Sequence, residues 1–359
     1  MWMQLGTSGA LVHSWQQFLV EQQLLQAAAL AGEEGRFDAA TADATLAYQR
    51  RRGLTVDGIV GEQTLNQARQ DGYSGLVAGP RYTLLYGLRS AATDDWEHPA
   101  ALIYAPPQLA LDDLAVIVYL HGLGNHIENV VREAPLSPDY PVADLLGQLD
   151  RAGRQALLLV PELRYDGETS DPGRFAAPGA LRLLLTEVLD KLPPPLSGLR
   201  VDEVRRLLLI SHSGGYQAAA ALALRGGVRV DELYLLDSLY GQEAAFSALL
   251  DETLAELAAA PPSDRGRELG AARRLINLYT RGGGTAELSR AQARRAGVEA
   301  ERLQLDPGLV RTSDEPLGPA ELPGGAAVLI QRVAVGHSEL PLQFFGPLLE
   351  KSGLPARRS

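Results

Sequence analysis

The residues of this sequence that could carry out chemistry centre on a serine at the end of an apolar run. Ser213 stands within Ser-His-Ser-Gly-Gly (211–215), which follows four apolar residues and precedes an alanine-rich stretch with the period of a helix. A serine hydroxyl becomes a nucleophile only when a base removes its proton and a carboxylate orients that base. The pattern therefore predicts a nucleophile in a turn between a strand and a helix, and it calls for a histidine and an acid elsewhere.

The apolar runs of the sequence indicate how such residues would be positioned. From residue 83 onward, runs of strand length alternate with longer segments of helical period, and the five central runs are apolar on both faces. The runs span residues 83–88, 101–106, 114–122, 155–162, 206–212, 232–237, 274–280 and 326–335. Strands that alternate with helices form parallel sheets covered on both faces, so the sequence predicts an α/β fold with a doubly wound, mostly parallel sheet.

This pattern resembles the α/β-hydrolases, in which a strand ends in a sharp turn that lifts a nucleophilic serine above the sheet. Residues 211–215 follow the G-x-S-x-G motif of that turn, except that Ser211 stands where the first glycine is usual. The resemblance implies the chain order serine, acid, histidine. It also implies that the base follows the last strand, and His337, directly after the run 326–335, is predicted to be that base.

The resemblance further implies that the acid ends a late strand. Asp237 ends the run 232–237 and is predicted to be the acid, a placement that some members of the family use. The more usual loop follows the next run, 274–280, and it offers no carboxylate. Asp306 and Asp314, further along the chain, remain alternatives.

The oxyanion of a tetrahedral intermediate needs two preorganised N–H donors. Gly214 follows the nucleophile at the predicted start of a helix, so its amide is expected to be one donor. The segment His-Gly-Leu-Gly (121–124) matches the His-Gly motif of the family and implies the amide of Leu123 as the other donor, with Gly124 as the second choice.

The first 72 residues have the pattern of a small helical domain. Residues 9–25 and 38–53 carry apolar residues at helical spacing, and a third short helix is predicted after Gly61. Glycine at position 53 would end the second helix without strain. The sequence therefore predicts a three-helix domain at the N-terminus.

This helical domain carries a specific motif in its second half. The motif residues are Tyr48, Gln49, Gly53, Leu54, Val56, Asp57, Gly58, Ile59, Val60, Gly61 and Thr64. They resemble the peptidoglycan-binding repeat domain of bacterial and phage cell-wall enzymes. The resemblance implies a peptidoglycan-binding domain over residues 1–72, followed by a linker over residues 73–82 and an α/β-hydrolase domain over residues 83–359.

Composition excludes several classes of function. The 359 residues carry a formal net charge of −11 and no cysteine, which excludes disulfides and thiolate nucleophiles. No basic run suggests a nucleic acid or an anionic membrane surface as a partner, and neither a zinc-ligand spacing nor a dinucleotide motif is present, so no cofactor is predicted. The start shows no signal-peptide pattern and no run is long enough for an integral membrane segment. The expected location is the cytoplasm, or the cell envelope after lysis or non-classical export.

Taken together, these patterns predict a serine hydrolase that cleaves carboxylic esters through an acyl-enzyme and is targeted to the bacterial cell wall. The expected partners are peptidoglycan or another wall polymer and an ester or lipid substrate. The pairing of domains resembles the phage lysin B type of cell-envelope esterase. A secreted lipase or phospholipase effector, an amidase and a non-catalytic wall-binding scaffold remain alternatives.

Overall fold

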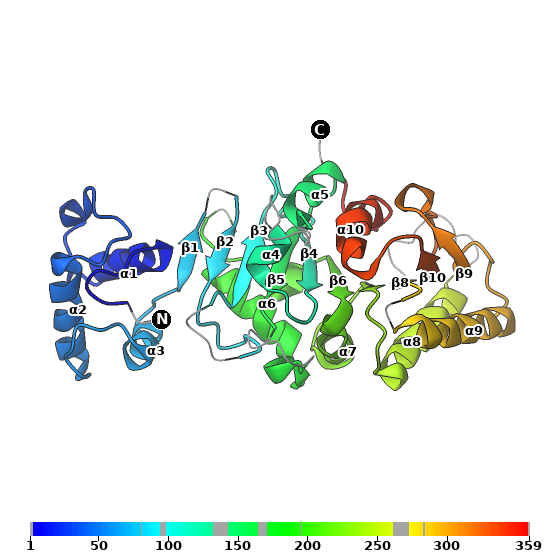
Figure 1. The fold of residues 1–359 in the computed structure, drawn as a ribbon, viewed down its shortest axis with the longest axis horizontal. Coiled ribbons are helices and arrows are strands. Elements are labelled where there is room, and N and C mark those ends of the chain that lie inside the picture. The colour runs from blue at the N-terminus through cyan, green and yellow to red at the C-terminus, as the bar shows by residue number, and fades with distance from the viewer. Residues whose placement is uncertain are drawn as a thin grey trace. The chain divides into compact units, whose positions relative to one another are not determined.

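The computed structural model divides the chain into two compact units. It describes residues 3–79, 81–93, 98–131, 143–163, 171–194, 196–260, 273–282 and 284–357. The first unit comprises Met1–Arg89 and Asp94–Ala101, and the second comprises Ser90–Thr93 and Leu102–Ser359. Each unit is described by itself below (Figure 1).

The described residues of the first unit form three α-helices and a short hairpin. The elements are α1 (Ala10–Glu21), the 3-10 turn η1 (Ala27–Leu30), α2 (Ala39–Arg52), α3 (Glu62–Gln70), β1 (Leu76–Ala78) and β2 (Thr83–Leu85). The two strands pair antiparallel. The core is aromatic, because Trp15 packs edge-on against Tyr48 and Tyr73 with ring centroids 5.6 Å away in both cases. The predicted helices are present, and the segment predicted as a linker contains Tyr73 and β1.

The motif of the second half holds a turn in place. The amide nitrogen of Gln49 donates to the carbonyl of Ile59 at 2.9 Å and to the hydroxyl of Thr64 at 3.2 Å. Its oxygen accepts from the amide of Gly58 at 2.9 Å, and Gly58 has a φ of +73°, which favours glycine. A buried side-chain amide needs partners for both its nitrogen and its oxygen. The glutamine, glycine and threonine of the motif therefore serve the fold of this turn.

A second glutamine repeats the arrangement in the first half. Gln16 donates to the carbonyl of Arg36 at 2.8 Å and to the hydroxyl of Thr41 at 3.0 Å, and its oxygen accepts from the amide of Gly35 at 2.8 Å. The partners occur in the same order and use the same atoms as those of Gln49. The first unit therefore contains two copies of one turn, although their sequences differ.

A mostly parallel sheet forms the centre of the second unit. Its strands are β3 (Ala101–Tyr104), β4 (Ala115–Leu120), β5 (Leu157–Pro161), β6 (Arg206–His212), β7 (Glu232–Leu236), β8 (Arg274–Tyr279), β9 (Val310–Leu317) and β10 (Val328–Val333). They lie in the order β3-β5-β4-β6-β7-β8-β10-β9. From β5 to β9, each pair of neighbouring strands is parallel. Every residue of β4 to β8 is buried, as the continuous apolar runs predict.

Helices cover both faces of this sheet. They are α4 (Ile127–Val131), α5 (Leu145–Arg151), α6 (Ala180–Lys191), α7 (Tyr216–Arg225), α8 (Glu243–Ala259), α9 (Ala286–Arg302) and α10 (Leu340–Glu350). Helices α5 and α10 lie on one face, and α6 to α9 lie on the other (Figure 1). The predicted α/β fold is confirmed: a small helical N-terminal region is followed in the sequence by a doubly wound, mostly parallel sheet.

Strand β9 is an element that the sequence did not predict. It pairs parallel with β10 at the edge of the sheet, and its residues are exposed or half-buried. An edge strand with charged side chains shows neither an apolar run nor a clear alternation, because little of it enters the core.

The order of the central strands determines where a site can form. Strand β6 lies between β4 and β7, and the chain passes from β4 to β5 on one side and later to β6 on the other. At such a reversal the loops diverge and leave a crevice beyond the carboxyl ends of the strands. The loops after β4, β6 and β7 all lie at the carboxyl ends of these strands.

Candidate active site

The predicted nucleophile occupies a sharp turn at the carboxyl end of β6. Ser213 begins a 3-10 turn, η4 (Ser213–Gly215), that continues directly into α7, and its φ is +49°. This left-handed backbone conformation is rare for residues other than glycine. A Cβ atom at Gly215 would lie 2.9 Å from the carbonyl oxygen of Leu120, so only glycine permits this close passage beside β4.

The serine that replaces the first motif glycine has a specific partner. Ser211 is fully buried, and its Oγ lies 2.6 Å from the Oγ of Ser238, in the loop after β7. The hydroxyl of Ser238 donates to the main-chain carbonyl of Ser213 at 2.9 Å. Because Ser238 uses its proton for that bond, Ser211 is the donor in the first one. Two hydroxyls thus connect β6 to the backbone of the predicted nucleophile.

The predicted base and acid lie in line with the serine. The Nε2 atom of His337 is 2.8 Å from the Oγ of Ser213. Its Nδ1 atom is 2.7 Å from the Oδ2 of Asp237. The histidine side chain is 31% exposed, whereas the aspartate side chain is fully buried. The structure therefore brings all three predicted residues together. The imidazole of His337 bridges the Ser213 hydroxyl and the Asp237 carboxylate, and solvent can reach it.

Two threonines hold the carboxylate of Asp237. The amide and hydroxyl of Thr280 donate to Oδ1 at 3.1 Å and to Oδ2 at 2.6 Å, and the hydroxyl of Thr285 also donates to Oδ1. Burial raises the pKa of Asp237, but the hydrogen bonds from His337, Thr280 and Thr285 outweigh it, so the pKa lies below its ordinary value. The acid therefore stays ionised at neutral pH. Sequence reasoning missed both threonines, although Thr280 directly follows β8, the neighbour of β7.

The two alternative acids have other contacts. Asp314, on β9, accepts a hydrogen bond from the hydroxyl of Tyr279 at 2.8 Å and contacts Arg290 at 3.2 Å. Asp306 accepts from the amide of Gly308 at 2.6 Å. Neither makes a described contact with the predicted base, whose Nδ1 atom is already paired with Asp237.

A second histidine packs against the predicted base. The rings of His212 and His337 have centroids 4.8 Å apart, and the Nε2 of His212 lies 3.1 Å from the main-chain oxygen of His337. Burial, together with the neighbouring His337, lowers the pKa of His212 to about 4. The ring is therefore neutral at pH 7, and Nε2 carries the proton because a carbonyl can only accept. His212 positions the turn that bears the base.

The loop after β4 approaches the predicted nucleophile closely. A Cβ atom at Gly122 would lie 3.0 Å from the Cβ of Ser213, so the backbone here touches the serine. Leu123 comes next, with its side chain 51% exposed, and Gly214 lies in the turn before α7. Within the described residues, the amides of Leu123 and Gly214 donate to no protein acceptor. Both predicted oxyanion donors are thus available to a bound group.

A buried contact between a histidine and a glutamate braces this loop. The Nε2 of His121 lies 2.9 Å from a carboxylate oxygen of Glu162, and its Nδ1 lies 3.0 Å from the carbonyl of Gly122. Burial opposes a charge on His121, but Glu162 outweighs it and raises the pKa of the imidazole. Burial also raises the pKa of Glu162, yet His121 reverses this and the pKa falls to about 2. Sequence reasoning missed Glu162, which follows β5 at the same edge of the sheet.

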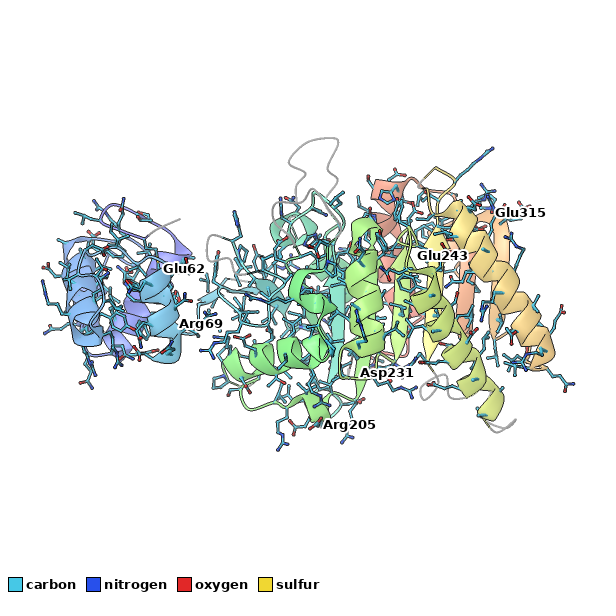
Figure 2. All side chains as sticks on the ribbon, turned by 90° about the horizontal axis from the view of Figure 1, so that it is seen from below. Glu62, Arg69, Arg205, Asp231, Glu243 and Glu315 are labelled. Carbon is cyan, nitrogen blue, oxygen red and sulfur yellow. The ribbon has the colours of Figure 1, made fainter. Side chains whose placement is uncertain are left out.

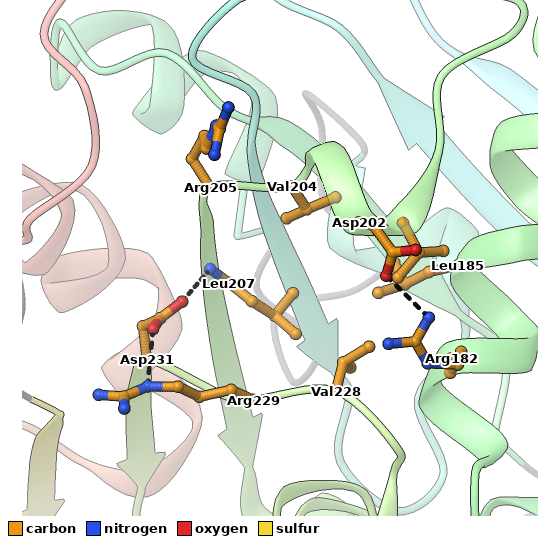
Figure 3. Close-up of a pocket in the computed structure, with 10 residues that line it drawn as sticks. Arg182, Leu185, Asp202, Val204, Arg205, Leu207, Val228, Arg229 and Asp231 are labelled. Atoms are coloured by element: carbon orange, nitrogen blue, oxygen red, sulfur yellow. Dashed lines mark hydrogen bonds and ion pairs between the residues drawn. The ribbon is translucent and has the colours of Figure 1, made fainter.

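A pocket of about 270 Å³ lies at the end of the strands opposite to Ser213 (Figure 3). Arg205 and Asp231, which line it, stand directly before β6 and β7, at the amino ends of these strands. Glu243 follows the loop that carries Ser238 and lies apart from both of them in Figure 2. Its charged groups pair across the rim, with Arg182 3.0 Å from Asp202 and Arg229 3.1 Å from Asp231. None of the residues that line this pocket belongs to the site around Ser213.

Two further features concern cofactors and membranes. Among the described residues, no three histidine, aspartate or glutamate side chains are grouped so that they could hold a metal ion. In the same part of the chain, no helix is both long and apolar enough to cross a membrane.

One comparison with a known family concerns the first unit. Residues 9–67 match the family model described as "Putative peptidoglycan binding domain". No curated protein matches the chain. Similar solved structures include the S954A feruloyl esterase module from Clostridium thermocellum with sinapinate, at 9% identity and a TM-score of 0.42 over 77% of this chain and 82% of that chain.

Two other similar structures are named as a lipase and a hydrolase. The hormone-sensitive lipase from a metagenome library has 15% identity and a TM-score of 0.38, over 76% of this chain and 84% of that chain. The S-formylglutathione hydrolase of Staphylococcus aureus has 11% identity and a TM-score of 0.37, over 69% of this chain and 88% of that chain. At these scores the likeness says nothing about activity, and the fold rests on the sheet and the turn at Ser213.

The predicted combination is confirmed. An N-terminal domain of the peptidoglycan-binding type precedes a unit with the α/β-hydrolase fold, defined by its parallel sheet, its two helix layers and the strand–turn–helix at Ser213.

Proposed function

We propose that the protein is a serine hydrolase that cleaves carboxylic esters through an acyl-enzyme, and that its N-terminal domain directs it to peptidoglycan. One observation carries the enzymatic part of this proposal. Ser213, His337 and Asp237 form a continuous chain of contacts, 2.8 Å and 2.7 Å long, although they come from three separate loops. Such a chain is what activates a serine hydroxyl.

In the proposed first half-reaction, the Oγ of Ser213 attacks the acyl carbon of the ester while the Nε2 of His337 takes the hydroxyl proton. Asp237 accepts a hydrogen bond from the Nδ1–H of the same ring and stabilises the imidazolium that forms. The amides of Leu123 and Gly214 hold the oxyanion. His337 then gives its proton to the alcohol oxygen, the ester C–O bond breaks, and the acyl group stays on Ser213.

In the second half-reaction, a water molecule takes the place of the alcohol. His337 removes a proton from this water, whose oxygen attacks the acyl carbon on Ser213. The tetrahedral intermediate collapses, His337 returns the proton to the serine oxygen, and the carboxylic acid leaves. The partial exposure of the His337 side chain supports this step, because water must reach Nε2.

The enzymatic proposal is tested with a Ser213→Ala variant. The wild-type protein is expected to react with a fluorophosphonate probe and to hydrolyse short-chain p-nitrophenyl esters, and the variant is expected to do neither. Ser197→Ala, at an exposed position, is the matched control and should keep both properties. A Ser213→Ala protein with wild-type ester hydrolysis would refute the mechanism, and a wild-type protein without labelling would favour a non-catalytic scaffold.

Wall targeting is tested by co-sedimentation with purified peptidoglycan sacculi. The full-length protein is expected to sediment with the sacculi, whereas Gln49→Leu should lose sedimentation and keep ester hydrolysis, because Gln49 holds a turn of the first unit only. Gln70→Leu changes an exposed glutamine at the end of α3 and serves as the control. A wild-type protein that does not sediment above an unrelated protein contradicts the targeting proposal.

A further inference from the structure

The loop that carries the predicted acid also places an aromatic residue beside the nucleophile. Tyr240 is 39% exposed, and its ring stands edge-on to that of His337, with centroids 6.2 Å apart and an interplanar angle of 82°. Burial and the charge of Asp237 raise the pKa of its hydroxyl, while a contact with the Ser213 side chain works in the opposite direction. The Tyr240 side chain thus borders both reacting groups and remains open to solvent.

A second tyrosine and two glycines complete this surface. Tyr216, the first residue of α7, has its ring centroid 6.1 Å from that of Tyr240. A Cβ atom at Gly284 would lie 3.2 Å from the Tyr240 ring, and one at Gly241 would lie 3.2 Å from the Tyr216 ring. A side chain at either glycine would crowd the neighbouring tyrosine ring.

The strand order shows which part of a substrate would meet Tyr240. The loop after β4, with Leu123, lies on one side of β6, and the loop after β7, with Tyr240, lies on the other. His337 follows β10, on the same side as β7. In a tetrahedral intermediate the oxyanion points to its N–H donors and the leaving oxygen points to the base. Tyr240 therefore lies on the side of the leaving group.

We propose that Tyr240, supported by Tyr216, is a specificity-determining residue that binds the alcohol part of the ester and selects alcohols that carry a ring. This inference rests on the proposed esterase function. An aromatic side chain offers a broad apolar face that packs against another ring at little cost in conformational entropy. An aryl alcohol presents a flat aromatic face and a sugar presents the C–H groups on one face of its puckered ring, whereas a short alkyl alcohol offers neither.

The test compares three esters that share the acetyl group and differ only in the alcohol. Ethyl acetate, phenyl acetate and 6-O-acetylglucose are assayed for kcat/KM with the full-length wild-type protein, Tyr240→Ala and Tyr240→Phe. Tyr240→Ala is expected to lower kcat/KM for a ring-bearing ester about tenfold more than for ethyl acetate, since a lost aromatic contact has that size. Tyr240→Phe keeps the ring and should retain the preference. Leu183→Ala, at a 62% exposed position on α6, is the control.

Deacylation separates specificity from structural damage. All three esters form the same acetyl-enzyme, so Tyr240→Ala should hydrolyse it at the wild-type rate, measured as the decay of trapped acetyl-enzyme after a phenyl acetate burst. A selective loss for phenyl acetate alone identifies an aryl alcohol, and one for 6-O-acetylglucose alone identifies a sugar; either supports the inference. An equal fall for all three esters, or no change, overturns it. A wild-type protein that neither hydrolyses an ester nor reacts with the fluorophosphonate overturns the proposed function itself.

Discussion

Ser238 offers a direct test of how the turn at Ser213 is held. In Ser238→Ala, the buried hydroxyl of Ser211 loses its acceptor and the carbonyl of Ser213 loses its donor. An unsatisfied buried hydroxyl costs about 1 to 3 kcal/mol and a lost hydrogen bond to a half-buried carbonyl about 1 kcal/mol, so the free energy of unfolding should fall by about 3 kcal/mol. Ser211→Ala removes one donor and leaves the bond to Ser213 intact, which should cost only about 1 kcal/mol.

The double variant Ser211→Ala/Ser238→Ala should be less destabilised than the sum of the two single variants. Once Ser211 is an alanine, the loss of the Ser238 hydroxyl removes only the hydrogen bond to the carbonyl of Ser213. The total is therefore expected to be about 2 kcal/mol, with a coupling energy of about 2 kcal/mol between the two positions. Ser238→Ala should also lower kcat/KM for ester hydrolysis, because the backbone of Ser213 loses a restraint.

Differential scanning calorimetry of the full-length variants measures these differences. The described tryptophan, Trp15, lies in the core of the first unit, so its fluorescence does not report on this turn. Each 1 kcal/mol should lower the transition temperature of the second unit by about 2 to 4 °C. Equal destabilisation by Ser211→Ala and Ser238→Ala, or strict additivity in the double variant, would refute the proposed chain of donors.

Three further variants test other parts of the site. Asp237→Asn should lower kcat for ester hydrolysis about ten-thousand-fold, whereas Asp314→Asn should leave it unchanged; a reversed result would make Asp314 the acid. Gly215→Ala should destabilise the protein by about 1 to 3 kcal/mol in a denaturant titration, while Gly297→Ala, which meets open space in α9, should not. His212 has a pKa of about 4 in the folded protein and an ordinary value of 6.5 in the unfolded chain. Between pH 6.5 and pH 4 the unfolded chain therefore binds a proton at His212 that the folded protein does not bind. The free energy of unfolding therefore falls as the pH falls through this range. His212→Gln should reduce the slope of the free energy of unfolding against pH by up to about 1.4 kcal/mol per pH unit. Denaturant titrations at pH 6.5, 5.5 and 4.5 measure this slope, and an unchanged slope would contradict the prediction.

Local patterns determined the elements and two of the residues brought together at the site. Buried strands are continuous apolar runs because both of their faces are covered, and β4 to β8 therefore stand out in the sequence. Ser213 follows such a run directly, and His337 follows the run 326–335 after one glycine, so their placement at a strand end follows from nearby residues. Strand β9 was missed because an exposed edge strand leaves no such pattern.

The partners of those residues were decided by the tertiary structure. Three aspartates were compatible with the sequence, and Asp237 is the one whose strand lies where its carboxylate reaches His337, 100 residues along the chain. The partner of Ser211 and the position of Tyr240 beside the base likewise follow from β6 lying between β4 and β7. Apolar periodicity records which faces are buried, but strand order depends on packing between distant segments, and no local pattern encodes it.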